Sequence, residues 1–279
     1  LAPTETVHIN VLDAGPERHV AAQLTAGGVQ GSVRLHRIPT DDAWCRDHGP
    51  LFLVGPAGRL LALDCRFNAW GGKYPPFDRD DAAAAAMAAA IDCPVHRESL
   101  VLEGGSVEVN GAGAVLTTRQ CLLNPNRNPG LSETAIEARL CALLGVEQVI
   151  WLGEGIVGDD TDGHVDDITR FIAPTRVVTA VEDDPDDANH APLRANRALL
   201  GDVRLAGGRP LEVIELPMPE PLWRDGERLP ASYANFYIGN GVVLMPAFGT
   251  ARDSDAANVL AACFADRRLV PIDARELVK

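Results

Sequence analysis

Three short polar segments of the chain hold the side chains that could do chemistry. They are Trp44-Cys45-Arg46-Asp47, Glu103-Gly104-Gly105, and the stretch from Asp160 to Asp166 that contains His164. His164 and Asp166 stand two residues apart, so on a strand both side chains would point to one face. Together the segments offer several carboxylates and one imidazole, groups that can hold a cation and move a proton.

A guanidinium group is the cation that such a set of side chains suits. It is planar and permanently charged, and its fork of N–H donors matches carboxylates. Hydrolysis at its resonance-stabilised carbon calls for a stronger nucleophile than water, and we expect a thiolate. A histidine would protonate the departing ammonia and later activate water, while a further carboxylate would hold the imidazole in place.

The aspartate-rich segment does not match a metal site. Counted as an EF-hand loop from Asp160, it has Val165 where glycine is required and Phe171 at the twelfth position. Zinc also fits poorly, because the segment offers one histidine and no cysteine pair. The segment therefore predicts neither a calcium site of the EF-hand type nor a zinc site. A second acidic stretch, residues 182–190, is interpreted as a solvated loop, with a metal or amine site as the alternative.

One order of elements recurs along the sequence and must position these segments: a helix, a strand, a polar loop and a hairpin. The expected helices cover residues 16–27, 81–91, 132–144, 192–205 and 254–265. The expected lone strands cover 33–38, 95–102, 148–152, 211–216 and 269–272, after an orphan strand at 7–12. The expected hairpins are 51–54 with 60–63, 107–109 with 114–117, 165–172 with 177–181, and 234–238 with 242–245.

Repeats of about 55–65 residues that mix helix and strand favour a closed ring of α/β modules. The alternative is a doubly wound parallel sheet, but regular hairpins argue against it, because parallel strands are joined through helices. In a ring, the polar loops would converge on the axis and assemble a site on a rigid scaffold. We expect one catalytic domain over residues 1–279.

Composition and charge exclude several classes of function. The 279 residues carry a net charge of −14, which makes nucleic acid an unexpected partner and would attract cationic substrates. The sequence has no apolar run of about 18 residues, so we expect no membrane-spanning helix. None of the six cysteines forms a CxxC pair, and their apolar surroundings indicate reduced thiols in the cytoplasm.

Five ordered motifs carry a family resemblance. They are residues 41–50 (DDAWCRDHGP), 67–74 (FNAWGGKY), 103–106 (EGGS), 117–129 (TTRQCLLNPNRNP) and 158–167 (GDDTDGHVDD). With these motifs the sequence resembles the agmatine deiminase family, which is related to bacterial peptidyl-arginine deiminases and arginine deiminases. The resemblance is strongest over residues 41–167 and continues more weakly to the end.

The resemblance implies a five-module α/β propeller, or pentein. It also implies hydrolysis of agmatine to N-carbamoylputrescine and ammonia through a covalent thiouronium intermediate, a step of polyamine biosynthesis towards putrescine, without a cofactor. Carried onto matching positions, Asp47 and Asp166 would clamp the guanidinium, His164 would be the general acid/base, and Glu103 would orient it. Trp44 would line the pocket and Asp160 would meet the distal amine. Relatives suggest a homodimer.

The nucleophile is expected outside the sequence. In the family, the cysteine follows a strand like residues 269–272 in a Gly-rich segment, so we expect it beyond Lys279, with a further segment upstream of Leu1. Neither Cys45 nor Cys121 is expected to replace it. Two other functions stay open. One is a deiminase of free or peptidyl arginine, which would use Arg46 for a carboxylate, and the other is an inactive guanidinium-binding relative.

Overall fold

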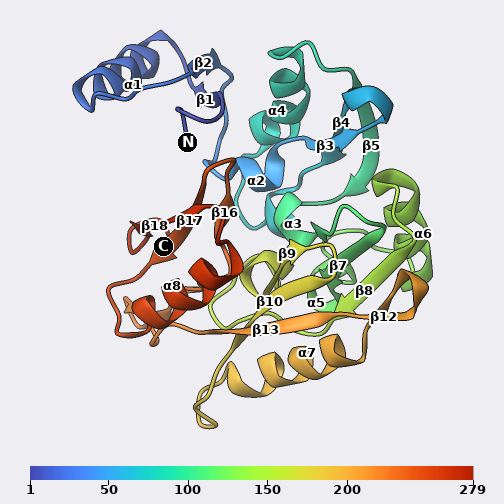
Figure 1. Cartoon of the computed structure of the whole chain (residues 1–279). Helices are drawn as coiled ribbons and strands as arrows, with labels where there is room; N and C mark the ends of the chain where they lie inside the picture. Colours follow the sequence, from blue (N-terminus) through green and yellow to red (C-terminus); the bar gives the residue numbers. More distant parts are fainter. Residues whose placement is uncertain (279) are drawn as a thin grey trace. The chain divides into compact units, whose positions relative to one another are not determined.

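The protein is a mixed α/β chain, and a computed structural model describes its residues 1–278 (Figure 1). The chain forms two compact units. The first consists of residues 1–104 together with 239–241, and the second of residues 105–238 together with the segment from Val242 onward. Each unit contains small sheets with helices packed on them, and each is described by itself.

The first unit contains two sheets. Its strands are β1 (Val7–Val11), β2 (Val33–Arg37), β3 (Leu51–Val54), β4 (Leu60–Arg66) and β5 (Val95–Val101). Its helices are α1 (Ala14–Ala26), α2 (Cys45–His48), α3 (Ala69–Gly72) and α4 (Asp78–Ala89). The predicted orphan strand is in fact paired, because β1 lies parallel to β2 with Val7 opposite Val33. β3 and β4 form a hairpin, and β5 joins β4 in parallel.

Small side chains bring α4 close to its sheet. Ala83, Ala84 and Ala88 are buried on the helix, and Ala88 packs with Ala62 of β4 and with Cys93. Alanine favours helix formation, and aspartates in the first turn complement the helix dipole. The helix also contacts α2, the turn that contains Asp47.

The second unit repeats the same plan. Its strands are β6 (Glu108–Val109), β7 (Ala114–Thr118), β8 (Gln148–Leu152), β9 (Thr169–Ala173), β10 (Arg176–Val181), β11 (Arg204–Leu205), β12 (Arg209–Pro210), β13 (Glu212–Pro217), β14 (Trp223–Arg224), β15 (Glu227–Arg228), β16 (Tyr237–Ile238), β17 (Val242–Ala247) and β18 (Arg268–Asp273). Its helices are α5 (Arg119–Leu122), α6 (Glu133–Leu144), α7 (His190–Asp202) and α8 (Arg252–Cys263).

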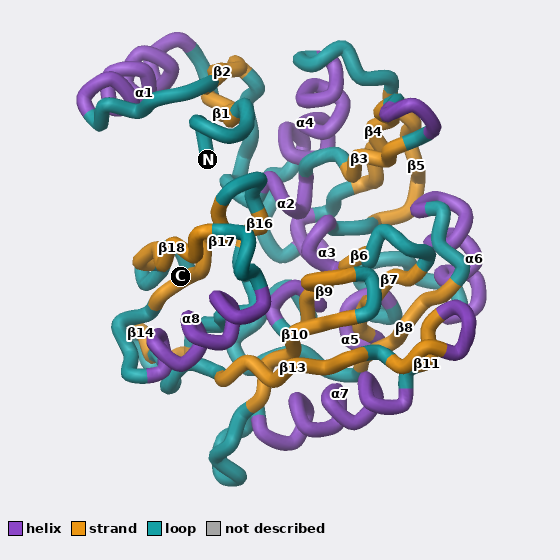
Figure 2. The backbone as a smooth tube through the Cα atoms, in the orientation of Figure 1, coloured by secondary structure: helices purple, strands orange, loops and turns teal. Residues whose placement is uncertain are grey.

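A hairpin, a helix and a parallel strand follow one another in both units. The three-stranded sheets have the orders β3-β4-β5, β6-β7-β8, β9-β10-β13 and β16-β17-β18. In each, the first two strands are antiparallel and the third is parallel to the second, reached through α4, α6, α7 or α8. Figure 2 shows α7 running along the sheet of β10 and β13. The predicted repeat of elements is therefore present.

The predicted ends of the elements agree with the structure in one case and differ in another. Ser132 caps α6 by accepting the Ala135 N–H at 3.2 Å, and Gly145 ends it at φ 66°, both as expected from their residue types. The strand predicted from residue 165 is wrong at its start, because Val165–Asp167 forms a 3-10 turn and β9 begins at Thr169. Among the described residues, no helix has the length and apolar character needed to cross a bilayer.

Candidate active site

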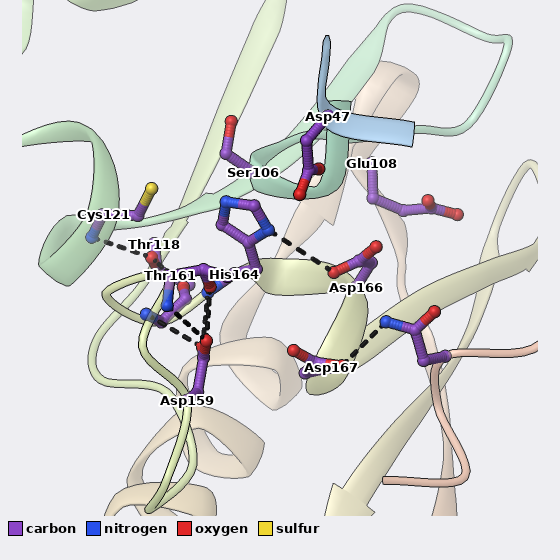
Figure 3. A network of polar contacts seen from close by, with 12 residues as sticks. Asp47, Ser106, Glu108, Thr118, Cys121, Asp159, Thr161, His164, Asp166 and Asp167 are labelled. Atoms are coloured by element: carbon purple, nitrogen blue, oxygen red, sulfur yellow. Dashed lines mark hydrogen bonds and ion pairs between the residues drawn. The ribbon is translucent and has the colours of Figure 1, made fainter. Parts of the chain in front are cut away.

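The backbone of His164 is fixed by the carboxylate of Asp159. One carboxylate oxygen of Asp159 accepts the N–H groups of Gly163 and His164, both at 3.0 Å. The other accepts the Thr161 N–H at 2.8 Å and the Thr161 hydroxyl. Because a carboxylate accepts up to four hydrogen bonds, this one side chain organises the whole turn before His164. Figure 3 shows these contacts converging on Asp159.

Gly163 is required where it stands. Its φ is +88°, a left-handed conformation that glycine adopts without strain. A side chain at this position would also come within 2.7 Å of the Gln120 amide oxygen. The Gly163 carbonyl accepts the Thr118 hydroxyl at 2.6 Å, so β7 anchors the turn from the other side.

His164 and Asp166 lie together, although not for the predicted reason. Residues 165–167 form a 3-10 turn, so the two side chains do not alternate on a strand. The turn nevertheless brings His164 Nδ1 to 4.0 Å from a carboxylate oxygen of Asp166 (Figure 3). Each residue is only 2% exposed. An imidazole and a carboxylate this close together can cooperate in proton transfer.

Two more carboxyl groups stand close to Asp166, and the sequence did not single them out. Glu108 pairs with Arg170 at 2.9 Å and accepts the Phe171 N–H at 3.0 Å. Burial raises the pKa of Glu108 and the charge of Asp166 adds to the rise, while Arg170 and the Phe171 N–H offset part of it. Arg170 is itself held by the Phe236 carbonyl at 2.8 Å.

Asp167 is the second of these carboxyl groups. It is partly buried and accepts the Asn235 side-chain amide at 2.8 Å. Burial raises the pKa of Asp167 well above its ordinary value, and the charges of Asp166 and Asp159 raise it further. The Asn235 amide and the charge of His164 act in the opposite direction.

Asp47 of the first unit is held by an indole. Its carboxylate is 8% exposed and accepts the Trp70 ring N–H at 3.0 Å. Trp70 in turn packs edge-on against Phe67, with ring centroids 5.1 Å apart. Asp47 lies in the helical turn α2, which begins after Trp44, so Trp44 and Cys45 do not alternate in direction as an extended segment would. Trp44 itself is 48% exposed.

Glu103 follows β5 and is fully buried, at 0% exposure. The glycine after it has a plain structural reason, because a side chain at Gly104 would come within 2.0 Å of the Arg46 carbonyl oxygen. The segment of Glu103 therefore packs directly on the turn that contains Asp47. Asp160, in the second unit, is exposed, whereas its neighbours from Gly163 to Asp166 are buried.

The sequence matches one family of known proteins over its whole length. A family model described as Porphyromonas-type peptidyl-arginine deiminase matches residues 1–279. The chain belongs to this family. A provisionally named agmatine deiminase of Selenomonas ruminantium is 42% identical over 273 residues, covering 89% of this chain and 74% of the relative.

Two solved structures of agmatine deiminases are similar to this chain. A cysteine-to-serine variant of C. jejuni agmatine deiminase with substrate bound has a TM-score of 0.88 at 31% identity, covering 99% of this chain and 79% of the other. An agmatine deiminase of Enterococcus faecalis, described as catalysing its reaction, also has a TM-score of 0.88 at 31% identity, covering 99% and 90%. The resemblance inferred from the sequence is confirmed.

Four of the six thiols of this deiminase-family chain are poorly suited to attack a substrate. Burial raises the pKa of Cys45 and Cys263, and it raises the pKa of Cys65 to about 12. Cys121 is 0% exposed, although its sulfur lies within 4.8 Å of a ring nitrogen of His164. A nucleophilic cysteine needs a lowered pKa and access to the substrate, and these four cysteines lack one or the other.

The acidic stretch at residues 182–190 is only partly a solvated loop. Asp183 is 70% exposed, in line with the prediction. Asp187 is instead held by Arg228 through two contacts of 2.8 Å. Burial alone would raise the pKa of Asp187, but the hydrogen bonds from Arg228 and the Asn189 N–H outweigh it and lower the pKa. Asn189 also accepts the Val157 N–H at 2.7 Å, which ties this stretch to the loop before His164.

Proposed function

We propose that this chain binds and hydrolyses the guanidinium group of agmatine, giving N-carbamoylputrescine and ammonia. The observation that carries the proposal is the buried pair of His164 and Asp166, an imidazole and a carboxylate 4.0 Å apart. Relatives and solved structures that bear the name agmatine deiminase support the choice of substrate. Agmatine is a dication, and a chain of net charge −14 attracts it.

The chemistry assigns one role to each predicted residue. Asp47 and Asp166 hold opposite edges of the guanidinium plane, and the Trp70 N–H fixes the carboxylate of Asp47 before the substrate arrives. A thiolate adds to the guanidinium carbon, and His164 gives its proton to the departing ammonia. His164 then takes a proton from the water that cleaves the thiouronium intermediate.

The remaining assignments depend on this chemistry. Glu103, buried in an apolar segment, orients His164 and favours its charged form. Trp44 stacks on the flat cation and Asp160 meets the distal ammonium group. We infer that the thiolate comes from a cysteine beyond Lys279. The four cysteines described above, which are buried or have a raised pKa, are poor replacements for it. The cytoplasmic location and the homodimer remain predictions.

The finer architecture is also a proposal. We infer that the repeated unit of hairpin, helix and parallel strand builds a five-module α/β propeller as one catalytic domain. The four three-stranded sheets of the described residues and the β1-β2 pair support this inference. In such a ring, the loops of Asp47, Glu103 and His164 occupy equivalent places in successive modules and meet at one site.

Comparing substrates tests the proposal. Ureido product would be measured for agmatine, free arginine and an arginine with both ends blocked. We expect agmatine to be preferred in kcat/KM by at least about tenfold over the other two. The α-carboxylate of free arginine would meet a site rich in carboxylates, and the blocked arginine lacks the free ammonium group that Asp160 would meet. A preference for either arginine compound would favour the alternative deiminase. Binding of agmatine without any product would favour the inactive relative.

A further inference from the structure

Asp167 directly follows the proposed clamp residue Asp166 in the same 3-10 turn. Its side chain accepts a neutral amide donor, Asn235, at 2.8 Å, and its main-chain carbonyl accepts the Ser232 hydroxyl at 2.7 Å. Asp167 is itself only partly buried, and Asn235 is exposed. Water can therefore reach the carboxyl group of Asp167, although the side chain is held in place by this contact.

The charges around Asp167 are mostly negative. Asp166 lies in the same turn, and the charges of Asp159 and His164, in the preceding loop, also act on Asp167. The nearby cation Arg170 is committed to Glu108 at 2.9 Å and to main-chain carbonyls. Within residues 1–278, no lysine or arginine side chain forms an ion pair with Asp167. A second negative charge beside Asp166 would therefore be costly until a cation arrives.

We propose that Asp167 holds a proton in the ligand-free protein and releases it to solvent when a guanidinium cation settles beside Asp166. This inference rests on the function proposed above and goes further, because it adds a third carboxyl group to cation binding. The step balances. One O–H bond of the Asp167 carboxyl breaks, the proton passes to the buffer, and the new negative charge compensates the positive charge that has entered. Burial and the neighbouring carboxylates, which raise the pKa of Asp167, favour the protonated state before binding.

Proton release can be separated from turnover, because the reaction itself is proton-neutral. Agmatine dication and water give the N-carbamoylputrescine monocation and ammonium, with no net proton near neutral pH. The experiment mixes the purified protein with agmatine in weak buffer containing an indicator dye, from about pH 5 to pH 8, and records the proton burst. Agmatine affinity is measured at the same pH values.

We expect the wild-type protein to release up to about one proton per molecule and to bind agmatine more tightly as the pH rises. Asp167→Asn should lose this burst. Its affinity should match the wild-type protein near pH 5 within about twofold, and fall at least about fivefold behind it near pH 8. N-carbamoylputrescine, whose ureido end is neutral, should cause no burst. Asp225→Asn, at a side chain 95% exposed, is the matched control and should behave as wild type.

A second variant keeps the test decisive if Asp167→Asn folds poorly. Asn235→Ala removes the donor that favours the ionised carboxyl, so the burst should move to higher pH. A wild-type protein that binds agmatine without a burst would overturn the inference, as would a burst that Asp167→Asn leaves intact. Absence of any agmatine binding by the wild-type protein would instead overturn the proposed function.

Discussion

Two side chains near His164 have structural roles that their residue types alone did not predict. Asp159 accepts four hydrogen bonds from the turn before His164, and Asp167 stands beside Asp166 with a raised pKa. His164 and Asp166 could be singled out from the sequence, since an imidazole and a carboxylate at short spacing indicate proton transfer. Asp159 could not, because its role depends on where four donors point after the turn has formed.

The raised pKa of Asp167 predicts a pH dependence of stability. A carboxyl group with a raised pKa in the folded state contributes stability that is complete below its unfolded pKa, about 3.9, and is lost as the pH rises through the folded value. Asp167→Asn cannot ionise and escapes this loss. The variant should therefore gain in free energy of unfolding relative to wild type as the pH rises above about 4.

Urea unfolding from about pH 3 to pH 8 measures this difference. The gain should level off once the pH exceeds the folded pKa of Asp167. Asp225→Asn, at an exposed side chain, should show a difference that does not change with pH. A loss of stability in Asp167→Asn that grows with pH would mean that Asp167 is charged in the folded protein.

At the scale of elements, the loop before His164 is fixed at three places. Asp159 holds its end, Asn189 holds Val157 at 2.7 Å, and a side chain at Gly158 would come within 2.1 Å of the Arg228 carbonyl oxygen. Arg228 is in turn bound to Asp187 at 2.8 Å. The loop is therefore held in one conformation by residues from separate parts of the second unit.

Loss of the Asp159 charge should loosen this loop. An amide presents one acceptor and one donor, so Asp159→Asn leaves some of the four N–H and O–H donors unmatched. We expect a loss of about 2 kcal/mol in the free energy of unfolding, since each hydrogen bond to a charged group contributes about 1.5–3 kcal/mol. Hydrogen exchange should rise at the Gly163 and His164 amides. Unchanged protection of these amides would contradict the assigned role of Asp159.

Elements were predictable from the sequence where local rules decide them. Ser132 and Gly145 mark the ends of α6 because a hydroxyl cap and a left-handed glycine act within one turn of helix. The stretch from Val165 was misassigned as strand, because Gly163, at φ +88°, turns the chain and residues 165–167 form a 3-10 turn. The pairing of β1 with β2 was missed because parallel partners are far apart in sequence.

At the scale of the whole molecule, the repeat of hairpin, helix and parallel strand is what the sequence indicated best. Each copy has its own turn and helix signals, so the order of elements follows from local residues. The proposed meeting of Asp47 and Glu103 with His164 and Asp166 does not follow from local residues. It would depend on contacts between segments far apart in sequence, and it remains the central proposal about this protein.

The most direct measurement of that proposal is ureido-product formation from agmatine by Asp166→Asn. This substitution keeps the shape of the side chain and removes the charge that would hold the guanidinium. Loss of one partner of a buried, charge-assisted pair costs about 3–5 kcal/mol, so kcat/KM should fall by at least about a hundredfold. Asp225→Asn should stay within about twofold of wild type. Near-wild-type turnover by a folded Asp166→Asn variant would contradict the guanidinium clamp.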